Sequence, residues 1–185
     1  VVDDAMVVLL DGGVSDEVAG LVRLGLHHEQ QHQELLLMDI KHVLSCNPTR
    51  VAYRPPASPP SGADPATLPV SWLEFDGGLV EVGHDGSGFA YDNEGPRHRV
   101  WLEPYRLADR LVTCGEWLEF MADGGYTDPR WWMAAGWDWV RSQQICAPLH
   151  WRRSSQQGAD WHAFSLRGLQ PLRANAPVCH ISWYE

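Results

Sequence analysis

The sequence predicts a mixed fold in which a helical segment is followed by an α+β domain. Three observations predict this fold class. Apolar residues recur with a helical period up to Cys46, prolines crowd residues 48–69, and a period of two typical of strands begins at Val70. We therefore divide the chain into a partial helical bundle at 1–47, a linker at 48–69 and an α+β domain at 70–185.

Two helices are expected in the first part. An apolar run at residues 4–12 suits the end of a helix, and Gly12-Gly13 would terminate it. Ser15 can cap a second helix, because its hydroxyl can accept a hydrogen bond from a free amide of the first turn. Asp16 and Glu17 would complement the positive end of the helix dipole. This second helix is expected to end near Ser45, before Asn47-Pro48.

The second helix carries a pair of histidines on one face. His28 and His32 are one turn apart, and Gln31 lies beside them. Side chains at this spacing are about 5–6 Å apart at Cβ, so two imidazoles can converge on one metal ion. Glu29 and Glu34 point roughly 100° and 240° away from His28 on an ideal helix. Neither carboxylate can therefore bind the metal together with the two histidines, although either could support a metal ligand indirectly.

From the spacing alone, several interpretations stay open. A polar block followed by Leu35, Leu36 and Leu37 is compatible with a metal site, a hydrogen-bonded core or a solvated face. The run from His28 to His32 also reads as the zincin motif H-E-x-x-H, with Glu29 as general base. The metzincin version requires Gly and His where this chain has Leu35 and Met38.

The linker holds seven of the 13 prolines and favours extended backbone. We expect an ordered strap in which Val51, Tyr53 and Leu68 dock.

The α+β domain is expected to open with a hairpin. VSWLEFDGG and LVEVGHD read as two strands joined at Gly77-Gly78, and another extended run begins at Arg97. Thr113 can cap a helix that Gly124-Gly125 ends. A further helix is expected from Asp128, with four tryptophans along it (Trp131, Trp132, Trp137 and Trp139). Irregular strands and loops follow Gln144.

Composition excludes some classes of partner. A formal net charge of -10 disfavours nucleic-acid binding, which needs Lys and Arg against phosphate. No apolar run approaches the ~20 residues that span a bilayer. Four widely separated cysteines without a C-x-x-C pair predict thiols in a reducing, cytoplasmic setting. Cys114 and Cys179 are expected to be buried. The first residue is Val and the chain ends on ISWYE, so we expect a piece of a longer protein.

Longer strings carry a family resemblance. HHEQQHQELLLMDIKH resembles the DinB-type helical domain of the ergothioneine-biosynthesis sulfoxide synthases. GGLVEVG, YDNEGPRHRVWLEPYRLADRLVTCGEWLEFMADGGY and PVCHISWYE resemble the formylglycine-generating-enzyme-like domain, also called the sulfatase-modifying-factor domain. That domain has a loop-rich fold of the C-type-lectin-like kind, and the sulfoxide synthases carry the two domains in this order.

The resemblance implies a non-haem iron(II) enzyme with three histidine ligands. Such enzymes use O2 to join hercynine (trimethylhistidine) to cysteine or γ-glutamylcysteine as a sulfoxide. By the motif, His28 and His32 would bind iron, Gln31 would hydrogen-bond hercynine and Glu34 would support the site. The third histidine, the catalytic tyrosine and the substrate-binding arginines are expected outside this chain. We therefore assign no catalytic residue within it and expect these 185 residues alone to be inactive.

Two other functions remain open. One is a DinB-type metal-dependent hydrolase or thiol transferase, and the linker with its second domain disfavours it. The other is a non-catalytic binding module built on the loop scaffold. Five further histidines stand without ligand spacing and are given no metal role: His84, His98, His150, His162 and His180.

Overall fold

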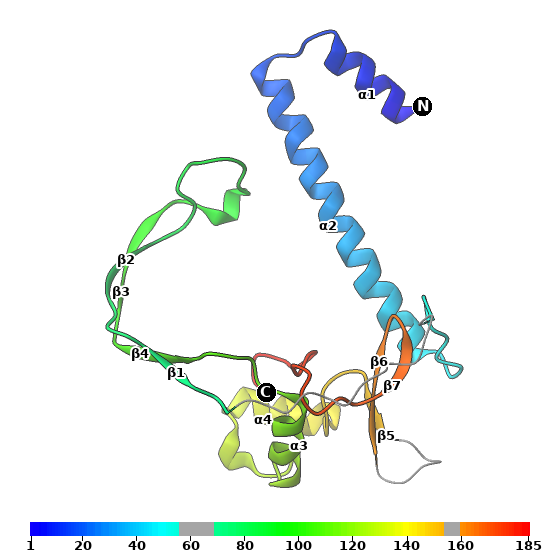
Figure 1. Ribbon diagram of the computed structural model, residues 1–185, viewed down its shortest axis with the longest axis vertical. Coiled ribbons are helices and arrows are strands. Elements are labelled where there is room, and N and C mark those ends of the chain that lie inside the picture. Colours follow the sequence, from blue (N-terminus) through cyan, green and yellow to red (C-terminus); the bar gives the residue numbers. More distant parts are fainter. Residues whose placement is uncertain (56–68, 154–159) are drawn as a thin grey trace. The chain divides into compact units, whose positions relative to one another are not determined.

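The computed structural model describes residues 1–55, 69–153 and 160–185. N-terminal helices are followed by a region of short helices and small antiparallel sheets, which makes the fold mixed α+β (Figure 1). The chain forms two compact units. One contains Val1–Ser61 and Ala147–Leu172, and the other contains Gly62–Cys146 and Arg173–Glu185.

The first unit opens with two helices, of which the first ends, and the second begins and ends, close to where the sequence predicts. Helix α1 spans Val2–Asp11 and helix α2 spans Asp16–Cys46. The Ser15 hydroxyl accepts a hydrogen bond from the Val18 amide at 3.3 Å, which caps α2. Asn47 has extended backbone, as expected before a proline, and ends the helix. Figure 1 shows α2 as one long helix.

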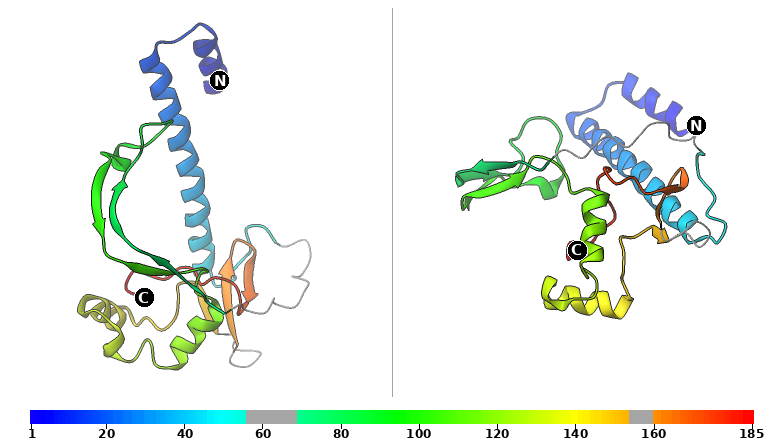
Figure 2. Two further views of the ribbon diagram at one scale, coloured as in Figure 1. Left: turned by 60° about the vertical axis from the view of Figure 1, so that its left-hand side comes forward. Right: turned by 60° about the horizontal axis from the view of Figure 1, so that its bottom comes forward.

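A three-stranded antiparallel sheet completes the first unit. It contains β5 (Trp151–Arg153), β6 (Trp161–Ser165) and β7 (Gly168–Pro171), in that order. Strand β6 contacts α2, and the sheet lies beside the C-terminal end of that helix in both figures (Figure 1 and Figure 2). Trp151 and Phe164 are buried. Residues far apart in the sequence thus build one unit.

The start of the predicted linker contacts this sheet through its backbone. The Arg54 amide donates to the Leu166 carbonyl at 2.9 Å. Docking of Val51 and Tyr53 is contradicted, because both side chains are more than half exposed. Residues 56–68, which include Leu68, lie outside the described residues. A backbone hydrogen bond needs no particular side chain, so apolar residues were a poor guide to this contact.

The second unit opens with four strands paired as a ribbon. They are β1 (Trp72–Phe75), β2 (Gly78–Val82), β3 (His98–Leu102) and β4 (Tyr105–Ala108). Strand β1 pairs with β4 and β2 pairs with β3, both antiparallel. The two pairs follow one another as a curved ribbon in Figure 2. The predicted hairpin between β1 and β2 is therefore wrong, although both strands exist.

Gly77 and Gly78 bend the ribbon and do not reverse the chain. Both have left-handed backbone, with φ of 73° and 101°. A Cβ on Gly77 would lie 2.3 Å from the Leu102 carbonyl oxygen. The returning strand therefore passes close to this glycine, and both strands change direction together.

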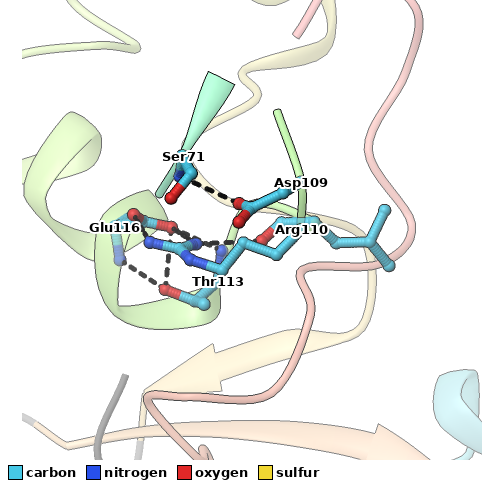
Figure 3. Close-up of polar contacts among 6 residues, drawn as sticks. Ser71, Asp109, Arg110, Thr113 and Glu116 are labelled. Atoms are coloured by element: carbon cyan, nitrogen blue, oxygen red, sulfur yellow. Dashed lines mark hydrogen bonds and ion pairs between the residues drawn. The ribbon is translucent and has the colours of Figure 1, made fainter. Parts of the chain in front are cut away.

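Helix α3 (Cys114–Ala122) begins with a capping box (Figure 3). The Thr113 hydroxyl accepts from the Glu116 amide at 3.3 Å, and the Thr113 amide donates to the Glu116 carboxylate at 2.8 Å. Arg110 grips the same carboxylate through two hydrogen bonds of 2.7 and 2.9 Å. Beside this network, the Ser71 amide donates to Asp109 at 2.9 Å and so joins the two ends of the ribbon. The start of α3 is thereby held to the end of β4.

The helix expected from Asp128 is broken in two. A short 3₁₀ helix, η2 (Pro129–Trp131), is followed by α4 (Ala134–Gln143). Asp128 caps the first turn by accepting from the Arg130 amide at 3.0 Å. Trp132 then has extended backbone, and its indole donates to the Gly125 carbonyl at 2.7 Å. This tertiary hydrogen bond holds Trp132 out of a helical conformation. A second 3₁₀ helix, η1 (Asp92–Glu94), lies between β2 and β3.

The core of the second unit surrounds Trp117. Its indole donates to the Tyr126 hydroxyl at 3.3 Å, and that hydroxyl donates to Glu185 at 2.5 Å. Burial is the main cause that raises the pKa of Tyr126 well above its usual value, so the group stays protonated and keeps this bond. Among the described helices, none is both long and apolar enough to cross a membrane.

Candidate metal-binding helix

The predicted histidine pair lies in the middle of α2. The ring centroids of His28 and His32 are 4.5 Å apart, and the ring planes are nearly perpendicular at 89°. Both side chains are exposed. The helix thus brings the two imidazoles into direct contact, as the one-turn spacing requires, and leaves them accessible to a metal ion.

Gln31 and Glu34 are also exposed residues of α2. Helical geometry places Gln31 about 60° from His28, on the histidine face, whereas Glu34 points to the opposite side. The amide of Gln31 can therefore meet a molecule bound at the pair. The carboxylate of Glu34 can act only from outside the ligands. The zincin alternative is no better placed, because Glu29 points about 100° away from His28.

Two imidazoles are a partial set of metal ligands. Imidazole nitrogen suits iron, zinc and copper, and both zinc and non-haem iron sites need at least three protein ligands. Within residues 1–55, 69–153 and 160–185, no group of three His, Cys, Asp or Glu side chains could hold a metal ion. The donor chemistry of His28 and His32 thus fits iron(II) as two of its ligands.

Exposed apolar residues flank the polar block that contains the pair. Leu24 and Leu35 bracket the histidines along the helix and are 44% and 48% exposed. Exposed leucines on both sides of a polar block show that this helix carries more apolar surface than the described residues cover. The histidine pair therefore lies on a helix face suited to further packing.

Other histidines form two separate groups. His84 and His98 line a shallow hollow at the end of the β2–β3 ribbon, together with Glu94. The His98 Nδ1 atom donates to the Pro96 carbonyl at 2.9 Å, and the His84 Nδ1 atom accepts from the Gly86 amide at 3.0 Å. Backbone hydrogen bonds thus already use one nitrogen of each ring.

The second group was missed by sequence reasoning. His150 lies with its ring centroid 5.6 Å from that of His42, and His42 approaches the thiol of Cys46. The one-turn spacing of His42 and Cys46 was a usable signal for half of this group. No spacing rule could place His150 there, because the contact depends on how the β5–β7 sheet meets α2.

The fold and the helix define an α+β protein of small antiparallel sheets preceded by a helix with a histidine pair. The family model described as the sulfatase-modifying factor enzyme 1-like domain matches residues 63–185. Because this match covers more than half of the chain, the protein belongs to that family.

Curated relatives extend the similarity to the helices. The chain is 28% identical over 180 residues to the hercynine oxygenase of Mycolicibacterium smegmatis, which covers 95% of this chain and 39% of that protein. It is 35% identical over 94 residues to the hercynine oxygenase of Mycobacterium tuberculosis, covering 51% of this chain and 21% of that protein. The hercynine oxygenase of Mycolicibacterium thermoresistibile is 29% identical over 160 residues, covering 85% of this chain and 33% of that protein. The chain thus spans less than two fifths of the length of these relatives.

Proposed function

We propose that the protein acts in ergothioneine biosynthesis as an iron(II)- and O2-dependent sulfoxide synthase. It would join hercynine to cysteine or γ-glutamylcysteine through a new C–S bond. One observation carries the proposal: the exposed His28–His32 pair lies on a helix of a chain that aligns over 95% of its length with a hercynine oxygenase. An alignment of that extent includes most of α2, where the pair lies.

The same proposal gives each of three segments of the chain a structural role. Residues 1–47 form part of a DinB-like helical bundle, 48–69 connect it, and 70–185 form a domain of the C-type-lectin-like kind. The exposed leucines of α2 support a bundle, because further helices would bury them.

The proposal gives a task to four residues of α2. The imidazole nitrogens of His28 and His32 hold the metal, and a third histidine from outside the described residues completes the set. Iron(II) bound there supplies the redox chemistry toward O2. Gln31, on the same face, orients hercynine through its side-chain amide. Glu34, on the other side of α2, positions the helix and does not touch the metal.

An anaerobic iron(II) titration tests the metal centre. We expect His28→Ala and His32→Ala in the intact protein to weaken iron binding at least tenfold, on the order of the loss typical for disturbed metal sites. His27→Ala is the matched control, because it removes an imidazole from the same helix about 100° away from the pair. Equal iron affinity in all four proteins contradicts the assignment.

A turnover assay then tests the reaction. Hercynine, a thiol and O2 are added to the iron-loaded protein, and the sulfoxide is detected by mass. Product from the wild type and none from either ligand variant supports the proposal. Metal binding without product would favour the hydrolase or thiol transferase class. Absence of both would favour a binding module.

A further inference from the structure

The C-terminal end of α2 places a thiol beside an imidazole. Cys46 is the last residue of the helix, and His42 precedes it by one turn. The Cys46 Sγ atom lies 3.7 Å from His42 Nε2, within reach of a sulfur hydrogen bond. Both residues are exposed. A nucleophile and a base thus meet at an accessible surface.

The residue between them is anchored. Ser45 is buried, and its hydroxyl donates to the His42 carbonyl at 2.7 Å. That bond lies in the last turn of the helix, which extends to Cys46. The one-turn spacing between the imidazole and the thiol is therefore that of a helix.

His150 supports the imidazole from the β5–β7 sheet. It is 4% exposed, and its ring centroid lies 5.6 Å from that of His42. Its backbone is left-handed, with φ of 74°, and its carbonyl accepts from the Phe164 amide at 3.0 Å. A buried neighbour held by the sheet limits the positions open to the His42 ring. The nucleophile and the base therefore lie beside a buried ring that packs near the base.

We propose that Cys46 is a site of reversible thiol–disulfide exchange with small disulfides, and that His42 is its base. The imidazole takes the proton of the thiol as Cys46 Sγ attacks one sulfur of the small disulfide. The S–S bond of that molecule breaks, a mixed disulfide forms on Cys46, and the departing thiolate receives the proton from His42. Cys46 is oxidised, and the released half of the small disulfide is reduced. A second small thiol reverses the reaction.

The proposal is independent of the iron centre, since it uses neither His28 nor His32.

The other cysteines of the chain serve as internal comparators. Cys146 and Cys179 are exposed, as Cys46 is, and Cys179 directs its thiol to the Pro177 carbonyl at 3.7 Å. The predicted burial of Cys179 is thus wrong. Cys114 is buried, as predicted, and directs its thiol to the same carbonyl at 3.6 Å. A carbonyl oxygen is a poor proton acceptor compared with an imidazole. Cys179 therefore matches Cys46 in exposure, but its thiol faces a carbonyl in place of an imidazole.

The experiment follows mixed-disulfide formation at each cysteine. The intact, reduced protein is incubated with oxidised glutathione, quenched with acid at intervals, digested and analysed by mass spectrometry. We expect Cys46 to react at least about tenfold faster than Cys179, a modest share of what a positioned base contributes. His42→Asn should lower the Cys46 rate to that of Cys179.

Two controls keep the result interpretable. His162→Asn removes an imidazole from β6 in the same unit and should leave the Cys46 rate unchanged. Hydrogen exchange in β6 reports folding of the unit that holds His42, whereas protection of Cys114 reports only the second unit. A Cys46 rate equal to that of Cys179, or one that His42→Asn leaves unchanged while exchange in β6 stays as in the wild type, overturns the proposal.

Discussion

Single residues on α2 differ in what geometry allows them to do. His28 and His32 touch, Gln31 shares their face, and Glu34 lies on the opposite side. Because the helix is regular through this block, these relations follow from residue number alone. In the proposed reaction the histidines therefore bind the metal, Gln31 binds the substrate and Glu34 contacts neither.

Replacement of Gln31 separates substrate binding from metal binding. We expect Gln31→Ala to raise the KM for hercynine roughly fivefold, the effect of one lost hydrogen bond, with iron affinity unchanged. The measurement pairs steady-state kinetics with the iron titration. Gln33→Ala on the same helix is the control, because residue 33 points about 140° from His28. A loss of iron affinity in Gln31→Ala would instead make it part of the metal site.

Glu116 makes the second unit sensitive to acid. Its hydrogen bonds to Arg110, the largest cause, and to Thr113 hold the folded pKa of this carboxyl at about 2, against a usual 4.5. A depressed folded pKa adds stability above the unfolded pKa, and that stability is lost as pH falls from 4.5 toward 2. We expect the urea midpoint to fall across this window.

The variant Glu116→Gln identifies the group responsible. It cannot ionise, so its midpoint should change less between these pH values than that of the wild type. Glu119→Gln, one turn later and outside the Arg110 network, should keep the wild-type dependence. If the urea midpoint falls with pH equally in the wild type and in Glu116→Gln, another carboxyl sets the acid sensitivity.

At the scale of elements, the β1–β4 ribbon depends on a bend at two glycines. Gly77 and Gly78 share left-handed backbone, but only Gly77 faces the opposite strand, where a Cβ would lie 2.3 Å from the Leu102 carbonyl oxygen. Space is open around Gly78 within 4 Å. Both positions therefore require a left-handed backbone, but only Gly77 lacks room for a side chain.

This difference predicts a ranking of two variants. Gly78→Ala should cost about 1 kcal/mol of unfolding free energy, the usual cost of a left-handed residue with a Cβ. Gly77→Ala should cost clearly more, because the strands must also separate. Urea denaturation measures both, and hydrogen exchange in β2 and β3 should rise mainly in Gly77→Ala. Equal losses would mean that the ribbon absorbs the added methyl group.

At the scale of the whole molecule, the first unit joins segments distant in the sequence. The β5–β7 sheet contacts α2 through β6, and Arg54 donates to Leu166 between the strands of the sheet's last hairpin. Phe164, at 3% exposure, is the most deeply buried aromatic side chain of the described residues and lies in β6. Its removal should therefore affect residues that precede it by more than a hundred positions.

Hydrogen exchange checks that coupling. We expect Phe164→Ala to cost about 3–5 kcal/mol and to raise exchange both in β6 and at the C-terminal end of α2. Exchange in α3, which belongs to the other unit, should stay as in the wild type. Leu169→Ala, at a half-buried position of β7, provides a milder comparison. Increased exchange confined to β6 and β7 would show that the sheet does not stabilise the helix.

The sequence by itself determined the features that depend only on residues close together in the chain. The cap at Ser15, the end of α2 before Pro48, the capping box of Thr113 and the shared face of His28 and His32 all depend on groups within four residues. The resemblance to sulfoxide synthases also came from contiguous strings, and the family match and the curated relatives support it.

Only the tertiary structure decided which distant segments meet. Period-two patterns predict strands and do not specify partners, so β1 was paired with β2 although it pairs with β4. A hydrogen bond from Trp132 to Gly125 broke a helix that local preference favoured. His150 reached His42 because a sheet formed late in the chain packs on an early helix. Such contacts depend on the free energy of packing the whole unit, which no local window of residues contains.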